Sequence, residues 1–289
     1  MKMKTSTEIG SSSKIVGYGK AVELVAKAGF DAWDFSLFGI VKRDGATGEL
    51  TDGAPCLSKA NYIAYAKELR KIGEDLGIHC NQSHAPLSTG TPGMPEYLKR
   101  AIECTAVAGG KICVVHPVGN EGTERNVELY NELLPFAREH GVKIAAENLF
   151  RWNEKTDTIM EAACSNHETF LELIEAVGDP YLVACLDIGH AEMQGLNTSA
   201  EQMVLTLGKH IQALHIHDNG KIRDDHQIPF SMNIDYGKIV RALKKVGYSG
   251  YFTLEADNFL PQYNEDNVLD GLRKLRHAVG RLCEMYEKE

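Results

Sequence analysis

Short apolar segments alternate with longer amphipathic segments along the whole chain. The apolar segments at 112–116 and 181–187 are rich in Val, Ile, Leu, Ala and Cys. Continuous runs of this kind are typical of strands that are buried on both faces of a parallel sheet. The amphipathic segments repeat their apolar positions with the period of a helix, and the one at 59–76 is followed by Gly77, a common helix terminator. The pattern therefore predicts strands and helices in regular alternation.

Eight such pairs of a strand and a helix follow one another. We predict strands at 5–9, 31–38, 78–84, 112–116, 142–148, 181–187, 211–217 and 250–255, and helices at 21–28, 59–76, 96–108, 127–140, 168–177, 200–207, 236–246 and a last one ending near 286. Alternation of this kind builds either an open doubly wound sheet or a closed barrel. Eight pairs in 289 residues, without a Gly-rich dinucleotide-binding motif after the first strand, favour the barrel. We therefore predict an α/β fold, a (β/α)8 TIM barrel that forms a single domain over residues 1–289.

Composition and charge narrow the range of partners. The chain has 31 Lys and Arg against 40 Asp and Glu, a net charge of −9. This balance disfavours a general affinity for nucleic acid or anionic membranes, because both require a basic surface. No apolar run is long enough to span a membrane, and the first ten residues lack the apolar core of a signal peptide. The seven cysteines include no C-x-x-C pair, which fits a reducing compartment, and we expect a cytoplasmic protein.

The predicted strand ends carry the candidate chemistry. In a (β/α)8 barrel, the carboxyl ends of the strands form the face that holds the active site. Six of the eight predicted strands carry a residue that can bind a metal at their end or within two residues of it, namely His84, His116, Glu147, Asp187, His215 and Glu255. Each of them alone could be a turn or capping residue, and Asp187 could cap the helix that follows. Their joint occurrence at matching positions of separate strands predicts a metal site.

The charges of these strand ends favour a cation. Glu147, Asp187 and Glu255 would repel one another at the mouth of the barrel unless a cation or protons compensated their charge. Together with His215 they offer three carboxylates and one imidazole to a divalent ion. This set suits Mn²⁺, Mg²⁺, Co²⁺ or Zn²⁺, and its excess of oxygen ligands favours Mn²⁺ or Mg²⁺.

Further candidates follow two of the strands. His190 comes three residues after Asp187, and we expect Gly189 to let the chain turn sharply enough for both side chains to face the pocket. Asp224 and His226 follow the seventh strand with one residue between them. The alternative for this second pair is a solvated polar loop. The basic residues of the same segment, Lys221 and Arg223, could hold an anionic group of a substrate.

Six passages in this order resemble the xylose isomerase-like barrel superfamily, which contains sugar isomerases and epimerases, inosose dehydratases and the endonuclease IV family. They are SHAP at 83–86, VHP at 115–117, AEN at 146–148, LDIGH at 186–190, LHIHD at 214–218 and FTLE at 252–255. The resemblance extends over nearly the whole chain. It departs after His226, where a Gly-x-Gly turn is common in these relatives and this chain has FSMNID at 230–235.

The resemblance implies two different metal centres. From the ketose epimerases it implies one divalent metal held by Glu147, Asp187, His215 and Glu255, with the two glutamates exchanging a proton with substrate carbon through an enediolate. In that case His190 contacts substrate oxygens, and His84 and His116 line the pocket. Arg223 stays a substrate-binding candidate because of its place in the segment after the seventh strand. From endonuclease IV it implies three zinc ions, for which the further ligands are His84, His116, His190, Asp224 and His226.

Three functions are consistent with the sequence. The leading hypothesis is a metal-dependent isomerase or epimerase of a sugar, sugar phosphate or related polyol. The alternative is a zinc-dependent, endonuclease IV-like phosphodiesterase acting on abasic DNA, which the charge of −9 disfavours. The third is a barrel without activity that binds sugar or serves as a scaffold. The expected partner is a small-molecule sugar or sugar phosphate. We expect no binding to nucleic acid or to a membrane. A homo-oligomer is possible.

Overall fold

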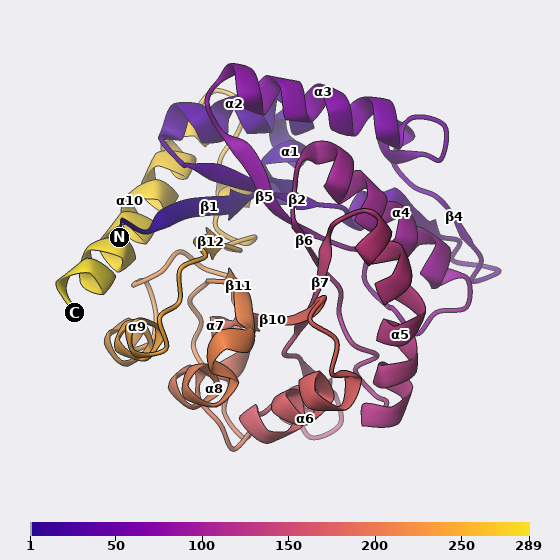
Figure 1. Cartoon of the computed structure of the whole chain (residues 1–289). Coiled ribbons are helices and arrows are strands. Elements are labelled where there is room, and N and C mark those ends of the chain that lie inside the picture. The colour runs from indigo at the N-terminus through magenta and orange to yellow at the C-terminus, as the bar shows by residue number, and fades with distance from the viewer. Residues whose placement is uncertain (1) are drawn as a thin grey trace.

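Eight parallel strands form the centre of the molecule in a computed structural model that describes residues 2–289 (Figure 1). They are β1 (Lys4–Glu8), β2 (Ala32–Ser36), β5 (His79–His84), β6 (Ile112–Val114), β7 (Lys143–Glu147), β10 (Leu182–Asp187), β11 (Ile211–His215) and β12 (Tyr251–Leu254). Each strand pairs with its neighbour in the chain, and β1 also pairs with β12. The remaining gap closes where the amide of Ile216 donates to Thr253 O at 2.9 Å and Glu255 donates to Ile216 O at 3.0 Å. The predicted (β/α)8 barrel is confirmed.

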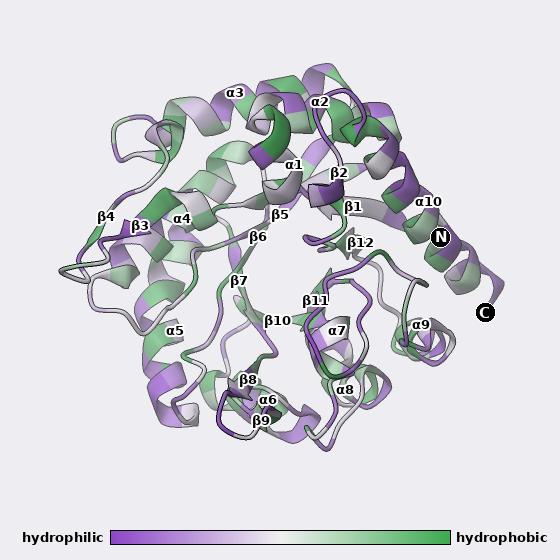
Figure 2. Ribbon diagram, turned by 180° about the vertical axis from the view of Figure 1, so that it is seen from behind, coloured by the Kyte–Doolittle hydropathy of each residue, from purple (hydrophilic) through white to green (hydrophobic). Residues whose placement is uncertain are grey.

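Helices surround this ring and turn their apolar faces toward it (Figure 2). They are α2 (Tyr18–Ala28), α3 (Tyr62–Asp75), α4 (Met94–Ala108), α5 (Thr123–Glu139), α6 (His167–Val177), α8 (Ala200–Leu207), α9 (Tyr236–Lys245) and α10 (Val268–Lys288). All eight predicted helices are present; α8 has the predicted bounds and the others have one or both ends shifted. Helix α4 begins two residues before its predicted start, because Pro95 stands in its first turn, where a missing N–H costs nothing.

Several short elements were not predicted. Helix α1 (Gly10–Val16) follows β1, and helix α7 (Ile188–Ala191) follows β10. One hairpin, formed by β3 (Val41–Arg43) and β4 (Leu50–Asp52), follows β2. A second hairpin, formed by β8 (Phe150–Asn153) and β9 (Thr158–Glu161), follows β7. Single 3-10 turns lie at Phe38–Ile40, Pro55–Leu57, Gly208–His210 and Leu260–Gln262. The hairpin strands have three or four residues, none of them buried, so they lack the apolar alternation that marks a strand. The first hairpin lies between β2 and α3, where no element was predicted.

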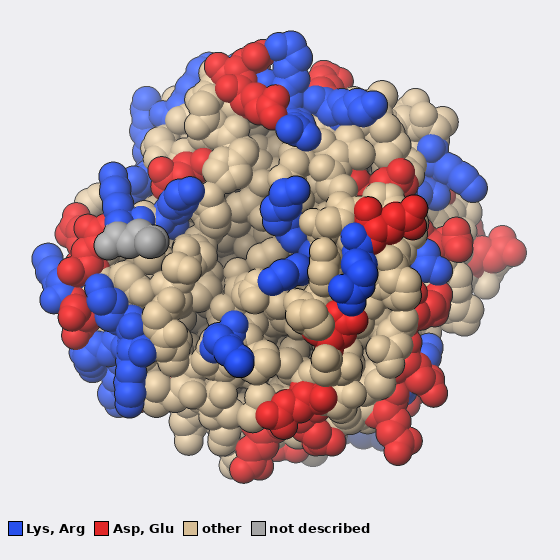
Figure 3. Space-filling model, in the orientation of Figure 1, with Lys and Arg blue, Asp and Glu red and all other residues tan. Residues whose placement is uncertain are grey.

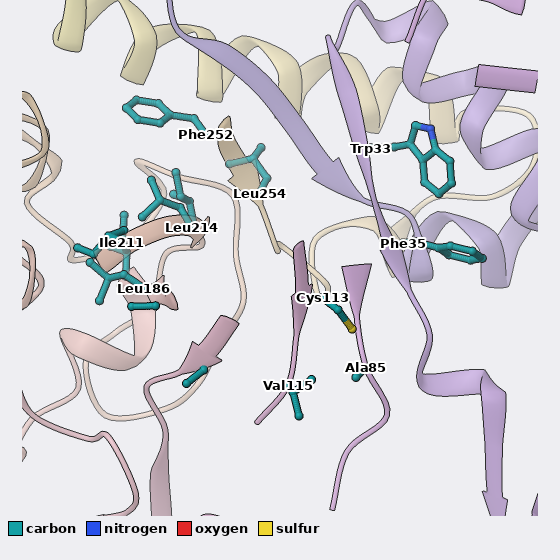
Figure 4. Packing of buried hydrophobic residues seen from close by; sticks show 14 of the residues in the cluster. Trp33, Phe35, Ala85, Cys113, Val115, Leu186, Ile211, Leu214, Phe252 and Leu254 are labelled. Carbon is teal, nitrogen blue, oxygen red and sulfur yellow. The ribbon is translucent and has the colours of Figure 1, made fainter. Parts of the chain in front are cut away.

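The core has an outer and an inner part. Trp33, Phe35 and Phe252 are buried and point from the strands toward the surrounding helices (Figure 4). Inside the barrel a separate apolar cluster contains the small or medium-sized residues Val114, Ala145, Val183, Cys185 and Ala213. The strands therefore alternate between helix-facing and barrel-facing side chains. The polar strand ends lie beyond the inner cluster.

Within residues 2–289, no helix combines the length and apolarity that a membrane crossing requires. On the face shown in Figure 3, Lys and Arg side chains are interspersed with Asp and Glu side chains. This mixture agrees with the modest acidic excess of the sequence.

Candidate metal centre

Four residues from four strand ends meet at one point in the mouth of the barrel. One possible ligand atom of each lies within 4.8 Å of those of the others, and all four side chains are buried: Glu147, Asp187, His215 and Glu255. Strand register produces this meeting, because Asp187 pairs with His215 across β10 and β11, and Cys185 pairs with Glu147 across β10 and β7. We call these four residues the inner group.

The imidazole of His215 is oriented for metal binding. Its Nδ1 atom lies 2.7 Å from Glu147 Oε1 and 3.2 Å from Glu255 Oε2, while its Nε2 atom lies 3.2 Å from Asp34 Oδ2. The amide of Gln82 donates to the same Asp34 oxygen at 2.9 Å. A carboxylate that accepts one ring N–H leaves the other nitrogen as an unprotonated ligand. Asp34 was not among the predicted site residues, and its only signal is a charge within the apolar segment AWDFS of β2.

Replacing Asp34 with Asn should weaken metal binding without removing any direct ligand. The amide accepts the His215 N–H less strongly than the carboxylate, so the ring is less firmly oriented. Loss of such a partner typically costs about 10- to 100-fold in metal affinity. Competition titration with a fluorescent chelator measures this change. Asp75→Asn on the surface of α3 is the matched control, and equal affinities of the two variants would contradict the role of Asp34.

Two more histidines contact the second oxygen of Glu147. Glu147 Oε2 lies 3.1 Å from His84 Nε2 and 2.9 Å from His116 Nε2. The Nδ1 atom of His84 lies 2.9 Å from Ala85 O, so this ring also has one nitrogen held by the backbone and one free to bind. Glu147 therefore contacts the inner-group residue His215 through Oε1 and a second set of nitrogen ligands, His84 and His116, through Oε2.

A third set of potential ligands lies beside Asp187, and we call it the outer group: His190, His217, Asp224 and His226. Asp224 Oδ2 lies 3.3 Å from His190 Nε2 and 3.0 Å from His226 Nε2. The Nδ1 atoms of the same two rings lie 2.9 Å from Asn148 O and 2.8 Å from Glu255 O. The predicted residues Asp224 and His226 thus belong to the strand-end cluster. His217 was not predicted to belong to the site, although it lies in the passage LHIHD.

Asp187 combines the two roles that the sequence left open. Its Oδ1 atom accepts the backbone N–H of His190 at 2.6 Å, so it caps α7 as the alternative interpretation suggested. Its own N–H donates to Asn148 Oδ1 at 2.8 Å. The Oδ2 atom is buried and has no hydrogen-bond partner among residues 2–289. The cap therefore uses one carboxylate oxygen and leaves the other available.

Gly189 is required for a reason other than the predicted one. It is not among the glycines with positive φ, so no sharp left-handed turn occurs there. Instead, a Cβ atom at this position would collide with the imidazole ring of His217. The glycine therefore permits the close approach of His217 to α7.

Replacing Gly189 with Ala should destabilise the protein by about 1–3 kcal/mol, the usual cost of an overpacked interior. Denaturant unfolding of the metal-free protein measures the change. A second substitution, His217→Ala, should recover part of the loss because it removes the ring that clashes. Gly45→Ala is the control, since a Cβ atom there meets open space. Wild-type stability of Gly189→Ala would contradict the proposed contact.

Electrostatics in the cluster favour a bound cation. Burial raises the pKa of Glu147, but His215 and His116 outweigh it and hold that pKa well below its usual range. Burial lowers the pKa of His226, but Asp224 outweighs it and raises the value to about 10. Two buried carboxylate oxygens, Asp187 Oδ2 and Asp224 Oδ1, have no partner within the described chain. Unpaired buried oxygens beside oriented imidazoles fit a divalent metal.

Metal uptake should therefore release protons at neutral pH. His226 has its pKa raised to about 10 without metal, so its ring is protonated at neutral pH and must lose the proton to become a ligand. Apparent metal affinity should rise as the pH increases toward that value. A weakly buffered titration with a pH indicator measures the release, and His226→Asn should release fewer protons. Equal release from both proteins would contradict this role.

The two predicted anion-binding residues lie elsewhere. Arg223 is exposed, lies 3.1 Å from Asp157 Oδ1, and stacks on the ring of Trp152 at 4.2 Å. Lys221 lies 2.8 Å from Glu192 Oε2. Both cations therefore pair with acidic side chains outside the loop after β11, Lys221 with Glu192 and Arg223 with Asp157. The structure does not bring either of them into the inner or the outer group.

A cavity of about 410 Å³ opens beside His116. Its polar lining consists mainly of hydroxyl, amide and carboxyl side chains from the loops after β5 and β6, namely Ser88, Thr89, Thr91, Asn120 and Glu121. Lys and Arg are absent from the described lining. Such a surface offers hydrogen bonds to a neutral polyhydroxylated molecule.

The chain belongs to the xylose isomerase-like TIM barrel family, whose family model matches residues 22–278. An uncharacterized protein of Methanocaldococcus jannaschii is 25% identical over 268 residues, which cover 86% of this chain and 82% of that protein. Among solved structures, the IolI protein with a bound zinc atom has a TM-score of 0.74 at 18% identity, covering 98% of this chain and 99% of that one. A D-tagatose 3-epimerase-like protein has a TM-score of 0.69 at 22% identity, with 98% and 99% coverage. These structural similarities show the shared barrel fold.

Proposed function

We propose that this protein is a metal-dependent isomerase or epimerase of a sugar or a related polyol. The observation that carries the proposal is the inner group, in which two glutamates approach the same imidazole nitrogen. Glu147 and Glu255 come from different strands and lie 2.7 Å and 3.2 Å from His215 Nδ1. A divalent ion held by His215, Asp187 and these glutamates would have carboxylates from the ends of three strands beside it.

This arrangement suits proton transfer at a carbon next to a carbonyl. The bound metal would supply polarisation of the carbonyl oxygen, which makes the neighbouring C–H proton more acidic. One of the two glutamates would remove that proton, and the other would return a proton to the carbon from its own side. His84 and His116 both contact Glu147 Oε2 and would fix the orientation of that carboxylate. No oxidant or other co-reactant is needed, since one proton leaves the substrate and one returns.

The surroundings support a sugar as substrate. The cavity beside His116 offers hydroxyl and amide groups, which suit a chain of hydroxyl-bearing carbons. A D-tagatose 3-epimerase-like protein and L-ribulose 3-epimerase share the barrel fold with this chain, the latter with a TM-score of 0.71 at 17% identity. Membership of this family and the polar cavity both favour a sugar as the substrate.

Hydrogen exchange tests the proposal directly. The protein, loaded in turn with Mn²⁺, Co²⁺ or Zn²⁺, is incubated in D₂O with a panel of free and phosphorylated ketoses and aldoses, and deuterium at carbon is measured by NMR. We expect incorporation next to the carbonyl of at least one sugar and its loss on chelation. Absence of exchange with every sugar and metal, in protein whose metal content has been measured, would refute the proposal.

One observation keeps phosphodiester hydrolysis as the second candidate. The structure brings all nine residues of the alternative three-zinc hypothesis into one connected cluster, with Glu147 between two sets and Asp187 beside the third. Clusters of metal ions can stabilise the attacking and leaving oxygens of a phosphodiester. Nicking of an abasic oligonucleotide that is lost on chelation would support this candidate, and intact substrate at saturating zinc would exclude it.

A further inference from the structure

A second cavity, of about 490 Å³, lies between helix α10 and the loops that follow β11 and β12. We call it the α10 cavity. The apolar side chains that line it are all buried or half-buried: Ile228, Pro229, Phe230, Phe259 and Ala278. The cavity beside His116 differs, because hydroxyl, amide and carboxyl groups form most of its lining. The α10 cavity therefore suits an apolar body better than a sugar.

Helix α10 gives the same cavity a basic edge. Four exposed basic side chains of this helix contribute to the lining: Arg273, Lys274, His277 and Arg281. Arg273 has an acidic partner, since its Nη1 atom lies 3.2 Å from Asp270 Oδ1. Within residues 2–289, no carboxylate lies within 4.0 Å of the charged nitrogens of Lys274 or Arg281. In a chain with a net charge of −9, such cations beside an apolar cavity favour an anionic ligand.

Phe230 lies between the apolar lining and the basic edge. The guanidinium of Arg281 is 3.8 Å from the centre of the Phe230 ring, a cation–π contact. The backbone of Phe230 has a φ of 71°, which a bulky residue adopts only where its surroundings enforce it, and such strain is concentrated at functional sites. Phe230 is also the first residue of FSMNID at 230–235, where this chain departs from the Gly-x-Gly turn of its relatives. The departure places an aromatic wall beside the basic side chains of α10.

We propose that the α10 cavity binds a small amphiphilic anion, a carboxylate carried by an aromatic or branched apolar body. The apolar body would pack against Phe230 and Phe259, and Arg281 would bind the carboxylate through two N–H groups. The volume of about 490 Å³ is within the usual range for small-molecule sites. None of the described lining residues belongs to the inner or the outer group. The inference therefore goes beyond the proposed function and does not depend on it.

Two other occupants fit the cavity less well. A second copy of this chain in a two-fold contact would bring the basic edges of both copies face to face, and like charges repel. A membrane surface would require apolar side chains that reach out into the lipid. The apolar residues of the α10 cavity are instead buried or half-buried. A recessed apolar lining with a basic edge fits a small ligand that brings its own negative charge.

Three matched probes test the inference on the full chain. They are 2-naphthoate, its neutral analogue 2-naphthamide, and acetate, with affinity and stoichiometry measured by isothermal titration calorimetry. We expect one 2-naphthoate per chain and at least about 10-fold weaker binding of 2-naphthamide, because the hydrogen bonds between charged groups are lost. Acetate should not bind detectably at the same concentration, because it buries too little apolar surface. Amide hydrogen exchange should slow at 228–231 and 273–281 when 2-naphthoate binds.

Variants of Arg281 locate the bound probe. Arg281→Gln should bind 2-naphthoate at least about 10-fold more weakly. Arg281→Lys should bind it with intermediate affinity, because the ammonium keeps the charge but lacks the planar group that contacts both carboxylate oxygens. Lys288→Gln removes one positive charge from an exposed position of the same helix and should bind as wild type. A carboxylate bound in the mouth of the barrel would not respond to Arg281.

Three results would overturn the inference: equal affinities for 2-naphthoate and 2-naphthamide, wild-type affinity of Arg281→Gln for 2-naphthoate, or no 2-naphthoate binding up to about 1 mM. Self-association in sedimentation velocity that Arg281→Gln abolishes would assign the cavity to a second copy instead. Binding to vesicles of phosphatidylcholine and phosphatidylserine that Arg281→Gln abolishes would assign it to a membrane. Failure of the sugar-exchange assay would leave these readouts unchanged and would refute only the proposed function.

Discussion

Replacing either Glu147 or Glu255 with Gln should abolish epimerisation of the substrate, and the variant that lacks the proton-removing glutamate should also lose exchange of the substrate C–H proton with solvent. Glutamine keeps the size of the side chain and an oxygen that can bind a metal, but it cannot accept a proton from carbon. Loss of a general acid or base typically reduces the rate by about 10²- to 10⁴-fold. Because one glutamate removes the proton and the other returns it, each single variant should stop epimerisation. Deuterium incorporation measured by NMR at saturating metal gives the result for both.

The control for this pair is Glu68→Gln on the exposed side of α3, which should behave as wild type. Metal content must be measured in every variant, so that a loss of activity is not confused with a loss of metal. Full exchange in both variants, with metal bound, would refute proton transfer by these glutamates. Exchange retained in one variant without epimerisation would show that the remaining glutamate removes and returns the proton on its own face of the substrate, whereas epimerisation retained in either variant would show that a single carboxylate serves both faces.

The strands that build the site were predictable because they are buried on both faces. Segments such as 181–187 have no polar residue until the strand ends, so the polar residue marks both the end of the strand and the mouth of the barrel. The hairpins after β2 and β7 gave no such signal, since their residues are partly or fully exposed. Their pairing depends on contacts across a turn and not on burial of an apolar face.

The two residues missed in the site illustrate a limit of reasoning from strand ends. Asp34 lies within β2 and not at its end, and only the register of the barrel places it beneath His215. The predicted strand at 211–217 ends at His217, whereas the observed strand β11 ends at His215. The bend after β11 turns His217 toward α7, where Gly189 makes room for its ring. Both roles depend on contacts between segments far apart in the chain, which no local pattern encodes.

The inner and outer groups meet at Asp187, so its substitution should have the widest effect on metal binding. Asp187→Asn and Asp187→Ala should both bind the inner metal more weakly, because each removes a negatively charged ligand. We expect an affinity loss above the roughly 10- to 100-fold that a partner of a ligand costs. Metal per chain and competition titration measure this loss.

The same two variants separate the ligand role of Asp187 from its capping role. Asn is as good a helix cap as Asp, whereas Ala costs about 0.5–2 kcal/mol. In the metal-free protein, Asp187→Asn should therefore remain close to wild type in unfolding free energy, and Asp187→Ala should fall below it by about that amount. Asn166→Ala, which removes the cap of α6, should lower stability similarly while leaving metal binding intact. Wild-type metal affinity in Asp187→Asn would show that the carboxylate serves only as a cap, and the inner group would then lack one of its proposed ligands.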